Sequence, residues 1–99
     1  MRMRARHSSG NVFRDLGFDP QEAENLRLRA DLMIQLTKLI DARRLTQARA
    51  AKLFGVTQPW VSDLVRGRIE LFSIDSLVEM LGRAGARVSL VVKPGKRVA

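Results

Sequence analysis

The stretch Leu45–Gly67, LTQARAAKLFGVTQPWVSDLVRG, predicts two short helices joined by a tight turn. A threonine precedes each helix, and the hydroxyls of Thr46 and Thr57 can accept hydrogen bonds from amides that a helix start leaves without a partner. Gly55 stands between the helices and can adopt a positive φ without a Cβ clash, which ends the first helix sharply. The spacing therefore predicts helix, turn and helix within one segment.

Apolar residues at helical spacing indicate that these two helices pack against each other. The buried faces are predicted to be Ala50, Ala51 and Phe54 on the first helix and Val61, Leu64 and Val65 on the second. The small side chain of Ala51 lets the helices cross closely, and Val56 fills the corner. A plain helical hairpin would not need two capped starts, a small crossing residue and a turn glycine together. The segment is predicted to be a helix-turn-helix, an arrangement that reads DNA.

The motif resembles the signature of the XRE/Cro family of regulators, which includes phage repressors and many bacterial antitoxins. The resemblance rests on Thr46-Gln47, Ala51, Gly55-Val56, Thr57-Gln58, Val61-Ser62, Leu64 and Gly67. It implies a lambda-repressor-like fold. The flanking runs VFRDLGF and RGRIELFSIDSLVEML are similar to small antitoxins of the HigA kind. That similarity implies a regulator of its own operon with a small toxin as partner, typically a ribonuclease.

Length and composition limit the rival classes. A chain of 99 residues makes one domain, which we place at residues 11–99 behind a flexible basic arm of residues 1–10. No apolar run is long enough to cross a bilayer, and the charged start is not followed by the apolar segment of a signal peptide. The chain contains no cysteine, which removes disulfides and thiolate metal sites. We therefore expect a cytoplasmic protein.

The net charge of +8 is concentrated on the predicted motif. Residues 43–68 hold six basic side chains against the single acid Asp63, whereas residues 1–42 hold seven against six and residues 69–99 hold five against three. Lysine and arginine at such a site would neutralise phosphates and release counterions. This concentration favours nucleic acid as the partner over the alternative of a merely solvated surface.

Two further helices complete the predicted bundle. The first follows Asp19 as cap, with Pro20 at the first helical position and Glu22 completing a pair like a capping box, and ends near Arg43 and Arg44. The second is capped by Ser73, runs through about Gly82 and ends before Gly85. The predicted buried positions are Leu26, Ala30, Met33, Leu36 and Ile40 in the first helix and Ile74, Leu77, Val78 and Leu81 in the second.

A single strand is predicted near the C-terminus. Val88, Leu90 and Val92 alternate with Ser89 and Val91 before Pro94-Gly95 stops the run. No second strand is evident in the chain, and a lone strand leaves its amide and carbonyl ladder unpaired. The simplest partner is the same strand of a second subunit, antiparallel about a two-fold axis. The alternatives are a frayed tail or a strand lying on the helices.

Position on the second helix of the motif predicts which residues meet DNA. The candidates on this helix are Thr57, Gln58, Pro59, Trp60, Ser62, Asp63 and Arg66. Gln58 is the first candidate for base recognition, because a Gln amide can donate to adenine N7 and accept from its N6 amino group, and the resemblance puts family contacts at this helix start. Gln47, Ser62, Arg66 and Arg68 are predicted to contact the phosphate backbone. An ordinary solvated polar residue is the alternative at each position.

Trp60 and Asp63 depart from the family pattern. Trp60 stands where the HigA branch commonly carries a basic residue, and it could pack at the motif's edge or contact a sugar or a thymine methyl group. Asp63 places an acid where the wider family often has Lys or Arg, and it could accept from cytosine N4 or orient an arginine. The base sequence that is read therefore stays open.

The sequence offers little for catalysis. His7 is the sole histidine and lies in the predicted arm, so we expect no enzyme activity, no metal site and no cofactor. An acidic cluster, Asp15, Asp19, Glu22 and Glu24, could hold a divalent ion, but helix-start charges favoured by the macrodipole explain it better. A third interpretation joins these acids with Phe13, Leu16 and Phe18 as a docking patch for a basic protein.

Together these features predict an all-α fold, a small helical bundle with a helix-turn-helix and one C-terminal β-strand paired across a dimer. The predicted function is a sequence-specific DNA-binding transcriptional regulator, a repressor and antitoxin that autoregulates a toxin–antitoxin operon. The predicted partners are double-stranded operator DNA, a second copy of the chain and a small basic toxin. The alternatives are a protein-interaction module that mainly neutralises a toxin, or a free-standing XRE regulator without one.

Overall fold

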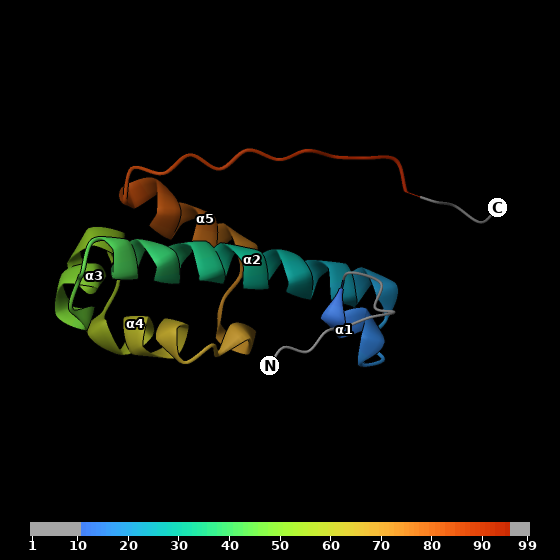
Figure 1. The fold of residues 1–99 in the computed structure, drawn as a ribbon, viewed down its shortest axis with the longest axis horizontal. Coiled ribbons are helices and arrows are strands. Elements are labelled where there is room, and N and C mark those ends of the chain that lie inside the picture. Colours follow the sequence, from blue (N-terminus) through green and yellow to red (C-terminus); the bar gives the residue numbers. More distant parts are fainter. Residues whose placement is uncertain (1–10, 96–99) are drawn as a thin grey trace.

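The computed structural model describes residues 11–95, and these residues form helices joined by short turns, without a strand. The helices are α1 (Val12–Asp15), α2 (Pro20–Ala42), α3 (Gln47–Phe54), α4 (Gln58–Val65), the 3₁₀ turn η1 (Ile69–Leu71) and α5 (Ile74–Arg83). Figure 1 shows α2 as the long axis, with α3 beside its C-terminal end, α1 beneath its N-terminal end, and α4 and α5 on opposite sides. The predicted all-α fold with a helix-turn-helix is confirmed.

The predicted side-chain caps are present at the helix starts. Each cap oxygen accepts a backbone amide hydrogen three residues ahead, which satisfies a donor that the helix itself leaves unpaired. The pairs are Asp19 with the Glu22 amide, Thr46 with Arg49, Thr57 with Trp60 and Ser73 with Ser76. At α5 the cap is reciprocal, because the Ser76 hydroxyl accepts from the Ser73 amide at 3.2 Å.

The turn between α3 and α4 has the predicted left-handed glycine. Gly55 has φ of 72°. The Val56 amide donates to the Ala51 carbonyl at 3.0 Å and the Gly55 amide donates to Lys52, the two bonds of a Schellman motif. The end of α2 is similar, since the helix stops at Ala42 and Arg44 takes a positive φ of 54°.

The core lies where α2, α3, α4 and α5 meet. Its buried side chains are Met33, Leu36, Ile40, Ala50, Ala51, Phe54, Val61, Leu64, Phe72, Leu77, Met80, Leu81 and Ala84. Most predicted core positions are confirmed, although Ala30 and Ile74 are only half-buried. Val65 and Val78 are 48% and 36% exposed, so the prediction that they are buried was wrong. Val65 ends α4 and Val78 lies on the outer side of α5, where no other helix of residues 11–95 covers them.

The predicted strand at Val88–Val92 is not present in the single chain. Residues 86–95 have no regular secondary structure, and Figure 1 shows them as an extended segment running back past α5. Leu90, Val91 and Val92 are 77%, 80% and 90% exposed, so this part of the segment does not lie on the helices. A strand needs a second backbone to pair with, and the described part of one chain does not offer one.

Two further expectations concern the ends of the chain and membranes. The predicted basic arm, residues 1–10 with His7, lies outside the described residues. Among residues 11–95, no helix combines the length and the apolar character that crossing a bilayer requires.

The turn geometry predicts opposite effects for two glycine substitutions. Gly55→Ala should lower the free energy of unfolding by about 1–2 kcal/mol, because a Cβ is strained at positive φ. The added atom would also stand 2.7 Å from Cδ of Arg83, which must move aside. Gly82→Ala is the matched control, since Gly82 lies inside α5 with open space at its Cβ position, and it should be neutral or stabilising by up to about 1 kcal/mol. Urea unfolding of both variants measures the difference, and equal effects would contradict this account of the turn.

Candidate nucleic-acid interface

The two helices of the motif bury one face of α4 and leave its start exposed. Val61 and Leu64 are almost completely buried against the core that α3 and α2 share. Gln58 and Pro59, in the first turn of α4, are exposed, as is Arg66 at its end. A short helix held along one side and open at its N-terminal end can enter a major groove of DNA.

The predicted DNA-binding residues lie on this helix pair or directly after it, but they differ in exposure and in hydrogen bonding. Gln58 lies at the first position of α4, and its side-chain amide has no hydrogen bond with any residue between 11 and 95, which suits a contact to a base edge. Thr57 is exposed, but its hydroxyl is engaged as the cap of α4. Ser62 and Asp63 are half-buried on the side of α4, and Gln47 is half-buried at the first position of α3. Their contacts with DNA stay predictions.

Trp60 packs against another aromatic ring at the edge of the motif. Its ring lies 4.6 Å from the ring of Phe72, centroid to centroid, with the planes 39° apart. Phe72 is only 2% exposed and follows η1, whereas Trp60 itself is half-buried. Of the two alternatives for Trp60, the structure shows packing at the edge of the motif. Phe72 was not anticipated from the sequence, because a lone aromatic residue after a 3₁₀ turn follows no helical period.

The two arginines after α4 differ in their surroundings. Nε of Arg68 lies 2.9 Å from a carboxylate oxygen of Glu70, and this hydrogen bond lowers the pKa of the Glu70 carboxyl and raises the pKa of Arg68. A phosphate would therefore compete with Glu70 for the Arg68 guanidinium. The side chain of Arg66 has no ion pair or hydrogen bond with any residue between 11 and 95. Arg66 is the arginine more directly available for a phosphate contact.

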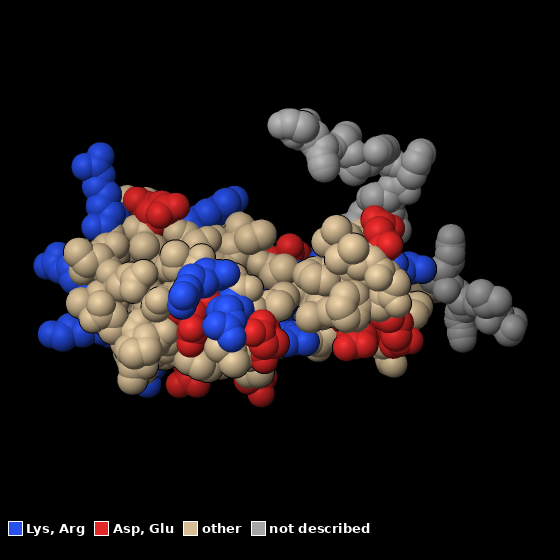
Figure 2. Space-filling view, turned by 90° about the horizontal axis from the view of Figure 1, so that it is seen from below, with Lys and Arg blue, Asp and Glu red and all other residues tan. Residues whose placement is uncertain are grey.

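Charge divides the molecule along its length. Figure 2 shows basic side chains projecting from the end that holds α3, and acidic side chains around the opposite end, where α1 and the start of α2 lie. The basic residues of the segment that holds the motif are Arg43, Arg44, Arg49, Lys52, Arg66 and Arg68. A polyanion such as DNA is attracted to this end, and the attraction weakens as salt screens it.

The acidic end has structural uses for its carboxylates. Asp19 caps α2, and a carboxylate oxygen of Glu24 lies 2.7 Å from Nη2 of Arg27. This hydrogen bond lowers the pKa of Glu24. Within residues 11–95, no three His, Cys, Asp or Glu side chains gather closely enough to hold a metal ion. The arrangement agrees with the interpretation of these acids as helix-start charges.

Taken together, the capped helix pair, its buried inner face and its exposed start define a helix-turn-helix DNA-binding protein. The sequence profile of a helix-turn-helix domain family matches residues 12–93. A solved structure whose name places it among XRE family transcriptional regulators is similar, with a TM-score of 0.70 and 36% sequence identity. The match covers 79% of this chain and 90% of that one. No curated protein matches the sequence significantly.

The chain therefore belongs to the helix-turn-helix family of XRE type and is a DNA-binding transcriptional regulator. The resemblance to the XRE family is confirmed at this level. The finer similarity to HigA antitoxins has no counterpart in these matches and stays a hypothesis.

The roles of Gln58 and Arg66 can be separated by binding measurements. Gln58→Ala should weaken binding to a duplex selected by the protein from a random-sequence library by about 1–3 kcal/mol, because a bidentate base contact is lost. Its binding to a scrambled duplex should hardly change. Arg66→Ala serves as the control, because loss of a phosphate contact should weaken binding to both duplexes. It should also lower the slope of log K against log salt by about one. If Gln58→Ala loses the same affinity for both duplexes, Gln58 contacts the phosphate backbone and not a base.

Proposed function

We propose that this regulator is a homodimeric repressor that places two copies of α4 in successive major grooves of an operator. The exposed start of α4, with Gln58 at its first position, carries the proposal for base reading. One helix of this length contacts few base pairs, and two half-sites about one helical turn apart multiply the discrimination. The protein would act in the cytoplasm by binding alone, without catalysis or a cofactor.

The proposed dimer contact is the segment Val88–Val92. Its three last side chains are exposed although they are apolar, and its backbone has no ladder partner within residues 11–95. Pairing with the same segment of a second copy, antiparallel about a two-fold axis, would satisfy the backbone and cover the apolar face. Because side chains alternate along a strand, Val88, Leu90 and Val92 would share one face of the paired strands, which the dimer would cover, and Val91 would lie on the other.

Opposite faces of the proposed strand provide matched variants. Leu90→Lys should convert the dimer to monomer and abolish tight binding to the selected duplex, because it places a charge on the covered face. Val91→Lys should be tolerated, since this side chain would face solvent. Sedimentation measures the state of each variant, and a chain ending at Ala86 removes the segment while keeping every helix through Arg83. A stable dimer of that shortened chain would place the interface on the helices.

A second candidate function, neutralisation of a toxin, is supported by the surface around α1. Val12 and Leu16 are 59% and 69% exposed. Next to them, a groove of about 420 Å³ is lined by apolar residues that include Phe13, Ile34 and Val65. Four carboxylates lie at the same end of the molecule, Asp15, Asp19, Glu22 and Glu24. An apolar surface beside negative charge suits a basic protein partner, which favours the antitoxin role over a free-standing regulator.

The antitoxin role predicts a selective loss in one double variant. Val12→Ser with Leu16→Ser should impair rescue of growth when the product of the adjoining gene is co-expressed. The melting temperature and duplex binding should stay almost unchanged, because exposed side chains contribute within about 0.5 kcal/mol to stability. If growth rescue, melting and DNA binding fall together, the residues serve folding. If the unaltered protein does not bind that gene product, the antitoxin role is wrong while DNA binding stands.

A further inference from the structure

We propose that Arg29, on the side of α2, is a positioning residue for DNA reading, which holds the start of α4 in place through the turn Ile69–Phe72 and the ring of Trp60. The proposal rests on the proposed operator reading by α4 and deepens it. Arg29 touches no predicted DNA contact. Its effect would pass through the turn Ile69–Phe72, then the Phe72 ring, and then the Trp60 ring.

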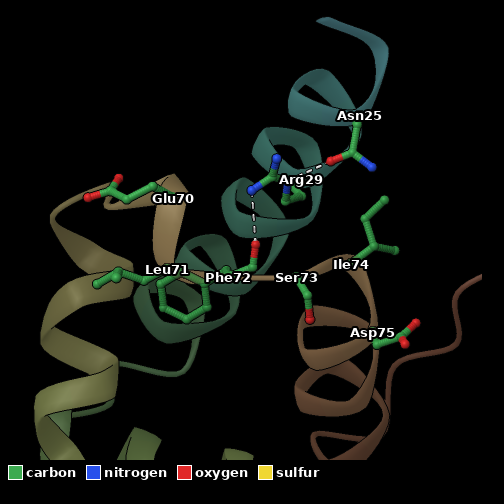
Figure 3. A pocket seen from close by; sticks show the side chains of 8 residues that line it. All are labelled: Asn25, Arg29, Glu70, Leu71, Phe72, Ser73, Ile74 and Asp75. Atoms are coloured by element: carbon green, nitrogen blue, oxygen red, sulfur yellow. Dashed lines mark hydrogen bonds between the residues drawn. The ribbon is translucent and has the colours of Figure 1, made fainter. Parts of the chain in front are cut away.

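Arg29 ties α2 to a segment about forty residues away. Its Nη1 donates to the carbonyl oxygens of Ile69 and Phe72, each at 3.2 Å, and its Nε donates to Oδ1 of Asn25 at 2.8 Å. Figure 3 shows the guanidinium between Asn25 of its own helix and the Phe72 backbone. The planar group thus bridges the carbonyl of the first residue of η1 and the carbonyl of the residue that follows η1.

These carbonyls belong to the turn that supports the Phe72 ring. The Phe72 amide donates to the Ile69 carbonyl at 3.2 Å, so the Ile69 carbonyl that accepts from Arg29 also closes the turn. The Phe72 ring is buried and lies against Trp60. A guanidinium that fixes both carbonyls therefore fixes where this ring stands.

Trp60 carries the constraint into the base-reading turn. It occupies the third position of α4, two residues after Gln58, and its amide donates to the cap Thr57. A hydrogen bond to a base edge tolerates only a few tenths of an ångström in length. If loss of the ring contact lets the backbone at Trp60 move, Gln58 moves with it, since both lie in one helical turn. The geometry links Arg29 to discrimination between sequences rather than to general affinity.

Arg27 offers a matched control on the same helix. It bears the same charge two residues away, but its partners are Glu24 at 2.7 Å and Asp31 at 2.9 Å, both on α2. Arg27→Ala removes a positive charge and local ion pairs without touching the turn. Arg29→Ala removes the same charge together with the long-range contact.

Trp60 is the sole tryptophan, and the chain has no tyrosine, so its fluorescence reports this contact without DNA. Arg29→Ala should shift the emission to the red and increase quenching by acrylamide, because a loosened Phe72 ring exposes the indole. Arg27→Ala should leave both unchanged. Arg29→Lys keeps the charge but cannot reproduce the planar bridge, and it should give an intermediate change.

DNA binding then tests the functional part. The probes are a duplex selected by the unaltered protein from a random-sequence library and a scrambled duplex of the same composition, both used at a temperature where circular dichroism shows the variants fully folded. Arg29→Ala should lose about tenfold in preference for the selected duplex while its binding to the scrambled duplex changes no more than that of Arg27→Ala. Arg29→Lys should recover part of the preference.

Each outcome has a defined meaning. The positioning role is overturned if the fluorescence of Arg29→Ala is unchanged, or if a folded variant keeps its full preference for the selected duplex. Arg29 would then contribute only to the stability of the fold. If Arg29→Ala does not fold, Arg29→Lys decides, and wild-type fluorescence and preference in that variant overturn the proposal. If the unaltered protein selects no duplex, the proposed operator reading fails, whereas the fluorescence comparison still tests the structural link from Arg29 to Trp60.

Discussion

The left-handed turn at Gly55 is the constraint on which the rest of the site depends. Its φ of 72° lets the Val56 amide bond back to Ala51, so α3 stops and α4 begins within three residues. The side chains of Ala51 and Val61 are then buried in the same core, and α4 presents its start to solvent. A residue with a Cβ at this point would strain the backbone and press on Arg83. The exposed start of α4 exists because the chain can reverse so tightly.

The segment after α4 does more than connect two helices. Arg68 pairs with Glu70, η1 forms a single turn, and Phe72 enters the core beneath Trp60. Arg29 then joins this segment to α2 across the fold. Helix α4 is thus held along its inner face by apolar burial and at its start by the packing of one aromatic ring. Such support from a neighbouring layer is what a precise binding surface needs.

Charge and exposed apolar area suggest how the surface is divided among partners. The basic end carries the helix-turn-helix, and the acidic end carries α1 with the exposed Val12 and Leu16. A polyanion and a basic protein would meet opposite ends and need not compete for one surface. The segment Val88–Val92 offers a third surface, and its backbone, which has no ladder partner within residues 11–95, suits a second copy of the chain. Under the proposed function, a regulator of this size would contact three different partners through separate elements.

The sequence by itself determined the local elements, because caps, turn glycines and apolar periods act between residues only a few positions apart. The predicted roles as cap or turn residue are confirmed for Asp19, Thr46, Gly55, Thr57 and Ser73. The helical spacing of the apolar residues correctly predicts the core positions Ala50, Phe54, Val61 and Leu64. Only the tertiary structure decided which boundary residues are covered. It leaves Val65 exposed and packs Trp60 on Phe72. It also brings Arg29 to carbonyls that lie about forty residues away in the chain. The position of Arg29 between Leu26 and Met33 indicated only that Arg29 lies near the buried side of α2. Such contacts depend on how whole helices meet, and no short-range pattern encodes that arrangement.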